Sequence, residues 1–93
     1  MGRIRKLEPA EHSRDLLVAL RELHLLAGEP SMRTIARSTG HKISSDTVHR
    51  VLTSPDLPRW DPLELVVIVL KGDVETFRTL WVSARRAMEQ DGG

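Results

Sequence analysis

The chain has 93 residues, of which 40% are hydrophobic and 29% charged, and its formal net charge is +1 at pH 7. This length and composition predict one soluble globular domain with a modest core. The absence of cysteine excludes disulfides, thiolate metal sites and thiol chemistry. The sequence has no apolar leader and no stretch of about 18 apolar residues, so we expect neither a signal peptide nor a membrane span.

The charge is distributed unevenly along the chain. Residues 1–7 sum to +3, residues 8–30 to −3, residues 31–60 to +3 and residues 61–93 to −2. Phosphate contact needs a local basic surface rather than a basic protein. The distribution is equally compatible with a phosphate-binding surface on the two basic segments and with a mixed, solvated surface.

The first predicted helix begins between Pro9 and Ser13, either of which is a good start signal. Gly28 provides a left-handed stop, and Pro30 blocks continuation. The apolar face of this helix, at helical spacing, is expected to comprise Leu16, Leu17, Leu20, Leu23, Leu26 and Ala27.

Residues 31–53 predict two short helices joined by a turn over residues 41–43. Ser31 is the expected N-cap of the second helix, which ends at Gly40. The third helix begins at Ser44 or Ser45 and ends near residue 53, because the prolines that follow cannot continue it. The inward-facing apolar residues of the pair are Met32, Ile35, Ala36, Val48, Val51 and Leu52.

The outward face of the third helix is polar and charged. It carries Ser45, Asp46, His49 and Arg50. A short helix with an apolar back and a hydrogen-bonding front fits the major groove of DNA. This feature is the main indication of function in the sequence.

Two further helices are predicted in the last third of the chain. Asp61 as N-cap and Pro62 at the first helical position start the fourth helix, although residues 65–70 taken alone read as a buried strand. We expect a helix, because a single strand would leave its backbone groups unpaired. Asp73 caps the fifth helix, whose apolar residues at helical spacing are Phe77, Leu80, Trp81, Ala84 and Met88. The expected organisation is a basic N-terminal arm (1–8), one domain (9–90) and a frayed tail (91–93).

Residues 16–86 resemble the phage-repressor-like (Cro/Xre) helix-turn-helix family. They are especially similar to small actinobacterial members that carry phrases such as AGEPS (here residues 27–31) and LPRW (residues 57–60). The resemblance implies an all-α, five-helix DNA-binding domain with the helix-turn-helix at its second and third helices. It also implies that the third helix enters the major groove while the second lies across the DNA backbone.

The same resemblance assigns candidate site residues. The base-reading positions fall on Ser45, Asp46 and His49, with Arg50 nearby, and the phosphate-contacting positions at the start of the second helix fall on Ser31 and Arg33. For Arg50 and His49 the alternative is a solvated residue on the helix surface, and for Asp46 it is a place in the first helical turn for dipole reasons. Other candidates for phosphate contact are His41, Lys42, Ser44, Thr47, Arg59, Arg3 and Arg5; for Thr47, as for Ser45, a role as a helix cap alone is the alternative. Arg59 could equally stack on Trp60, and the N-terminal arginines either follow the DNA or have no role.

The sequence contains no nucleotide-binding glycine loop, nucleophile elbow or paired-carboxylate motif, and its four histidines are scattered. We therefore expect no enzyme activity, no cofactor and no metal site. The predicted function is sequence-specific binding of double-stranded DNA by a cytoplasmic, nucleoid-associated transcriptional regulator, for which we expect a homodimer. The alternative is a protein-interaction module or an antitoxin-like partner that uses the same fold.

Overall fold

The computed structural model describes residues 9–54 and 56–92, with side chains described for residues 14–54 and 56–89. This part of the chain forms five α-helices and no strand. The helices are α1 (Pro9–Leu26), α2 (Met32–Ser38), α3 (Ser45–Thr53), α4 (Trp60–Val69) and α5 (Val74–Gly92). The all-α, five-helix prediction is confirmed for these residues, and the β-branched segment after residue 65 lies in a helix.

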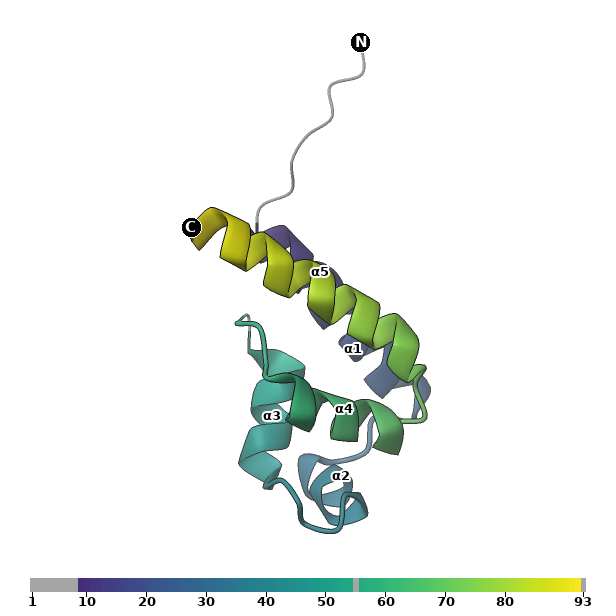
Figure 1. Ribbon diagram of the computed structural model, residues 1–93. Helices are drawn as coiled ribbons and strands as arrows, with labels where there is room; N and C mark the ends of the chain where they lie inside the picture. The colour runs from purple at the N-terminus through teal and green to yellow at the C-terminus, as the bar shows by residue number, and fades with distance from the viewer. Residues whose placement is uncertain (1–8, 55, 93) are drawn as a thin grey trace.

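The two long helices, α1 and α5, lie side by side and run in opposite directions, with α2, α3 and α4 clustered next to them (Figure 1). α4 links the two parts, because it packs against α2, α3 and α5. All five helices contribute to the buried core, which comprises Leu16, Leu20, Ile35, Ala36, Val48, Val51, Leu52, Leu63, Val66, Val67, Leu70, Phe77 and Ala84. No helix in the described part is long and apolar enough to cross a membrane.

The end of α1 confirms the predicted stop. Gly28 has φ +91° and Glu29 has φ +53°, and the Glu29 N–H donates to the His24 carbonyl at 2.9 Å. Two expected core residues are nevertheless exposed: Leu26, at 75%, and Ala27. Ala27 lies beyond the last helical residue and Leu26 at the edge of the apolar face, so their prediction as inward-facing residues was wrong.

α4 begins two residues before its predicted first residue. Arg59 occupies the N-cap position in an extended conformation, without a side-chain cap hydrogen bond. Asp61 and Pro62 therefore lie in the first turn, and the predicted cap by Asp61 is wrong. Pro62 is tolerated because the first backbone N–H groups of a helix have no partner within it. The carboxylate of Asp61 still interacts favourably with the helix dipole.

In the connection between α4 and α5, the backbone at Gly72 lies close to the side chain of Leu23 in α1. Lys71, rather than Gly72, adopts the left-handed conformation, with φ +63°. A Cβ at Gly72 would lie 2.6 Å from Leu23 Cδ2 of α1, so glycine lets this connection pass directly over α1. Asp73 caps α5 as predicted: its Oδ1 accepts from the Glu75 N–H at 3.2 Å.

α5 buries only part of its predicted apolar face. Phe77 and Ala84 are buried, Leu80 and Trp81 are partly buried, and Met88 is 39% exposed. The helix includes residues 91 and 92, which the sequence assigned to the tail, and residue 93 lies outside the described part.

Candidate nucleic-acid interface

α2 and α3 pack against each other and are joined by residues 39–44. This connection is longer than the turn of about three or four residues in the usual helix-turn-helix motif. It contains two consecutive left-handed residues, Gly40 (φ +73°) and His41 (φ +62°), and the buried Thr39 hydroxyl donates to the Ala36 carbonyl at 2.7 Å. These features fix the point at which the chain reverses into α3.

Serine side chains cap both helices of the pair. The Ser31 Oγ accepts from the Thr34 N–H at 3.0 Å, and the Ser44 Oγ accepts from the Thr47 N–H at 3.2 Å. The predicted caps are therefore confirmed, and of the two predicted starts of α3 the N-cap is Ser44. Each hydroxyl also contacts the threonine hydroxyl three residues on, at 2.9 Å for Ser31 and 3.2 Å for Ser44.

We expect Ser44→Ala to lower the free energy of unfolding by about 1 kcal/mol, because it leaves the Thr47 N–H without its cap. The matched control is Ser45→Ala, which removes the neighbouring exposed hydroxyl and should change stability by less than about 0.5 kcal/mol. Urea denaturation measures both. Equal losses in the free energy of unfolding of the two variants would contradict the assignment of the cap to Ser44.

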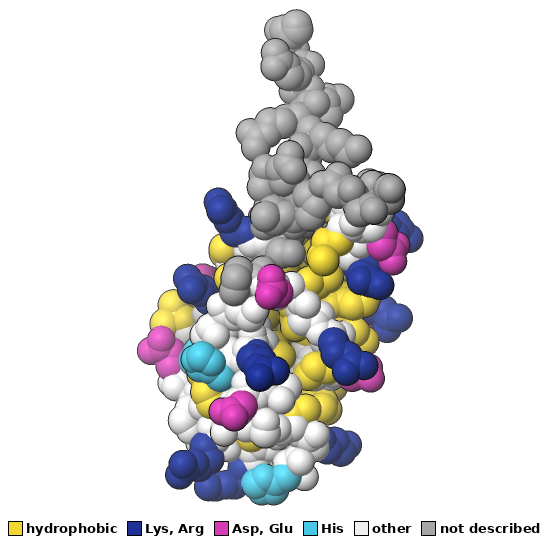
Figure 2. Space-filling model, turned by 90° about the vertical axis from the view of Figure 1, so that its left-hand side faces the viewer, with side chains coloured by type: hydrophobic (Ala, Val, Ile, Leu, Met, Phe, Trp, Pro, Cys, Tyr) yellow, Lys and Arg dark blue, Asp and Glu magenta, His cyan; other side chains and the backbone are white. Residues whose placement is uncertain are grey.

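α3 has two opposite faces. Its buried face consists of Val48, Val51 and Leu52. The four base-reading candidates are all exposed, and at 3.6 residues per turn they fall within an arc of about 140°. Figure 2 shows the side of the molecule on which α3 lies, where basic, acidic and histidine side chains are interspersed among other polar ones. The structure thus brings Ser45, Asp46, His49 and Arg50 together on one solvent-facing surface, the α3 stripe.

The sequence reasoning missed Thr53, which extends the α3 stripe by one turn. Its hydroxyl donates to the His49 carbonyl at 2.7 Å and lies 3.5 Å from His49 Nδ1. Thr53 is therefore close enough to influence the position of the His49 ring. The spacing of Ser45, His49 and Thr53, four residues apart each time, was the signal that could have identified it.

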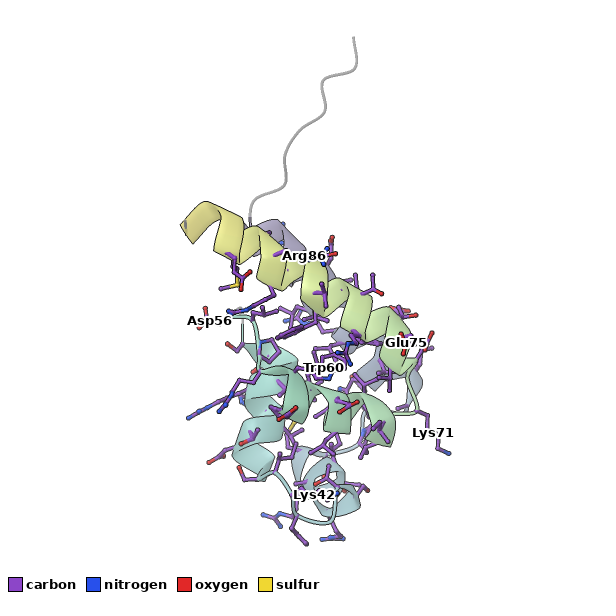
Figure 3. All side chains as sticks on the ribbon, viewed as in Figure 1. Lys42, Asp56, Trp60, Lys71, Glu75 and Arg86 are labelled. Atoms are coloured by element: carbon purple, nitrogen blue, oxygen red, sulfur yellow. The ribbon has the colours of Figure 1, made fainter. Side chains whose placement is uncertain are left out.

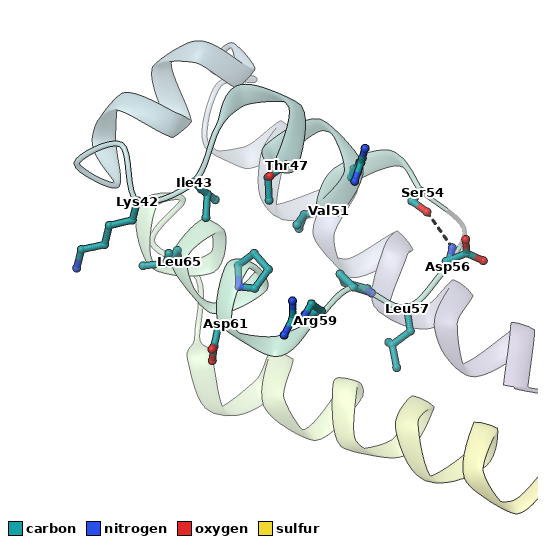
Figure 4. A pocket seen from close by; sticks show the side chains of 13 residues that line it. Lys42, Ile43, Thr47, Val51, Ser54, Asp56, Leu57, Arg59, Asp61 and Leu65 are labelled. Carbon is teal, nitrogen blue, oxygen red and sulfur yellow. Dashed lines mark hydrogen bonds between the residues drawn. The ribbon is translucent and has the colours of Figure 1, made fainter.

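Beside the stripe, a groove of about 610 Å³ lies between α3 and the start of α4. We call it the α3–α4 groove. Lys42, Thr47, Arg50 and Arg59 line it and come from the turn, α3 and the α4 N-cap (Figure 4). Two acidic side chains also line it, those of Asp56 and Asp61, so its positive charge is partly offset.

The remaining candidates occupy other positions. Ser31 and Arg33 are exposed at the start of α2, outside the α3–α4 groove, and His41 is exposed on the turn next to the groove-lining Lys42, which Figure 3 labels. The guanidinium over the Trp60 ring belongs to Arg78, 5.6 Å from the ring centroid, rather than to Arg59. Arg3 and Arg5, for which the sequence left a contact to DNA and no role as alternatives, lie outside the described residues.

Among the described residues, no group of three or more histidine or acidic side chains is placed to hold a metal ion. Comparison with protein-family models, with curated proteins and with solved structures finds no match for this chain. The function is therefore inferred from the chemistry and placement of the chain's own residues.

Proposed function

We propose that this chain binds double-stranded DNA sequence-specifically, with α3 in the major groove, and acts as a transcriptional regulator. The observation that carries the proposal is the two-sided construction of α3, with apolar residues buried behind an exposed polar stripe. The stripe offers side chains that pair with base edges. Arg50 can donate twice to guanine, Ser45 can donate or accept, and Asp46 can accept from the cytosine amino group.

Phosphate contacts would come from the residues that flank the stripe. The charges of Asp46 and Arg50 cancel within the α3 stripe. Attraction to the DNA backbone therefore depends on Lys42 and Arg59, which line the α3–α4 groove, and on Arg33 of α2. Such contacts set the position and orientation of a protein on the duplex, while the base contacts specify sequence. This division of roles gives each group of residues a different expected effect.

We expect Lys42→Ala to weaken binding to every duplex and to reduce the slope of log K against log salt by about 0.9, because one phosphate is no longer neutralised. The control is Lys71→Asn, which removes a lysine from the connection after α4 (Figure 3) while keeping a residue tolerant of the left-handed conformation. This control should leave the slope unchanged. An unchanged slope for Lys42→Ala would show that Lys42 does not bind phosphate.

The proposal is tested by selection from a randomised duplex library at near-physiological salt. An enriched palindrome would indicate a homodimer, with half-sites one helical turn of about 34–36 Å apart or a multiple of it. A single enriched site would indicate a monomeric reader. Salt-sensitive background binding without enrichment would contradict sequence-specific recognition.

A second candidate function is protein interaction, including an antitoxin-like role. The exposed Asp46 on a stripe of zero net charge favours it, because an acidic group facing DNA opposes binding to the backbone. Duplex binding at low salt separates the two candidates. A DNA reader binds all duplexes there, whereas an interaction module shows little binding.

A further inference from the structure

A second hollow, of about 340 Å³, lies between the start of α4 and residues 81–88 of α5. We call it the tryptophan groove. Its apolar lining includes Leu57, Trp60, Trp81 and Met88, and its basic lining consists of Arg59 and Arg85. Figure 2 shows apolar side chains gathered in a band, with lysine or arginine side chains close to it.

The aromatic part of this groove is held in place by several contacts. The rings of Trp60 and Trp81 are 5.9 Å apart and tilted by 53°. The Trp81 Nε1–H donates to the Pro58 carbonyl at 2.7 Å, and the Arg78 guanidinium lies over the Trp60 ring. An apolar surface ordered in this way offers its contact area at a lower entropic cost on binding than a mobile one.

Among the described residues, both charged side chains that line the tryptophan groove are basic, whereas Asp56 and Asp61 line the neighbouring α3–α4 groove. Within the described part of the chain, the Glu89 carboxylate pairs with a lining arginine: its Oε2 lies 3.4 Å from Arg85 Nε. Both side chains are more than half exposed, at 53% and 62%, so this pair is weak and a ligand carboxylate can replace it.

We propose that the tryptophan groove binds an acidic amphipathic peptide segment of a partner protein. The apolar side chains of that segment cover Trp60, Trp81 and Met88, and its carboxylates pair with Arg59 and Arg85. Aromatic and arginine side chains beside each other are the typical composition of strong interface positions. This interaction goes beyond DNA binding, since it uses α5, which does not line the α3–α4 groove; the two grooves share only residues 57–59.

Two other occupants fit less well. A DNA backbone would pair with the arginines but would leave the apolar lining uncovered. A second copy of this chain would offer the outer face of α1, where Val18 and Leu25 are exposed. Over its described residues 14–25 that face is not acidic, because Arg14 and Arg21 accompany Asp15 and Glu22. Charge complementarity therefore favours an acidic partner.

The experiment is selection of a displayed random-peptide library on the full chain, followed by titration of the enriched peptides. Trp60 and Trp81 are the only two tryptophans in the chain, so intrinsic fluorescence reports directly on this groove. The test variant is Arg85→Glu. The matched control is Arg86→Glu, which reverses the charge of the neighbouring exposed residue on α5 outside the groove lining (Figure 3).

We expect the enriched peptides to be acidic with apolar residues at regular spacing, and to change the tryptophan emission. Arg85→Glu should lower the affinity for these peptides by about tenfold or more, because it places a negative charge opposite their carboxylates. Arg86→Glu should retain most of the affinity. Circular dichroism of both variants checks that they fold. Absence of enrichment, enrichment of neutral or basic peptides, or equal losses in the two variants would overturn the proposal.

Two further results would reassign the groove and also overturn the proposal. Self-association in sedimentation that Arg85→Glu alone abolishes would identify a second copy as the occupant. Duplex DNA that changes the tryptophan emission, and that Arg85→Glu but not Arg86→Glu weakens, would identify a contact to the DNA backbone.

Discussion

Replacing Leu63 with alanine is expected to lower the free energy of unfolding by about 2–5 kcal/mol. Leu63 has 0% exposure and lies in α4, which packs against α2, α3 and α5. The substitution removes buried methyl groups and leaves a cavity at the junction between the α2–α3 pair and α5. Small domains are stable by about 5–15 kcal/mol, so this loss is a large share of the total. Urea denaturation followed by circular dichroism measures it.

The control for this prediction is Ile68→Ala in the same helix. Ile68 is 53% exposed, so its truncation leaves no internal cavity, and alanine has the higher helix propensity. We expect a change within about 0.5 kcal/mol. Similar losses for Leu63→Ala and Ile68→Ala would contradict the orientation of α4, because only one of these residues faces the core.

Most helix boundaries could be predicted because their signals are local. Ser31, Ser44 and Asp73 each accept a hydrogen bond from a backbone N–H within three residues, and Gly28 adopts the left-handed conformation itself. Such contacts depend on residue type and spacing alone. The sequence therefore contained enough information to place α2, α3 and the end of α1.

Long-range contacts account for what the sequence did not reveal. The guanidinium over Trp60 comes from Arg78, 18 positions along the chain, and Trp81 donates to Pro58 across 23 positions. The glycine at residue 72 is needed because Leu23 of α1 lies against it. No local sequence pattern predicts these contacts. The tryptophan groove could not be predicted for the same reason, since its lining combines residues 57–60 with α5.

The candidate site likewise has one part that local sequence patterns predict and another that depends on long-range contacts. The α3 stripe follows from helical spacing, which is why its four residues could be named from the sequence. The α3–α4 groove required the placement of α4, since Asp56, Arg59 and Asp61 reach it from beyond α3. The acidic residues in that groove alter its expected electrostatics, and only the folded structure places them in the same groove as Arg50.

Arg50→Ala is expected to weaken binding to the selected DNA site by about 1–3 kcal/mol and to relax sequence preference at one base position. Arg50 is exposed on the α3 stripe and also lines the α3–α4 groove, so its guanidinium can reach either a base edge or a phosphate. Its exposure means that the substitution should leave stability nearly unchanged. Competition binding with the selected duplex and with a scrambled duplex measures the effect.

The comparison between the two duplexes decides which contact Arg50 makes. Loss confined to the selected duplex indicates base readout, because a scrambled sequence has no matched base to lose. Equal loss on both duplexes assigns Arg50 to phosphate. Arg37→Ala, which removes an arginine of α2 that is also exposed, controls for the general effect of charge. It should change the affinity for either duplex only slightly. If Arg50→Ala behaves like this control, α3 does not read bases through Arg50, and the contribution of Ser45 and His49 becomes the next point to test.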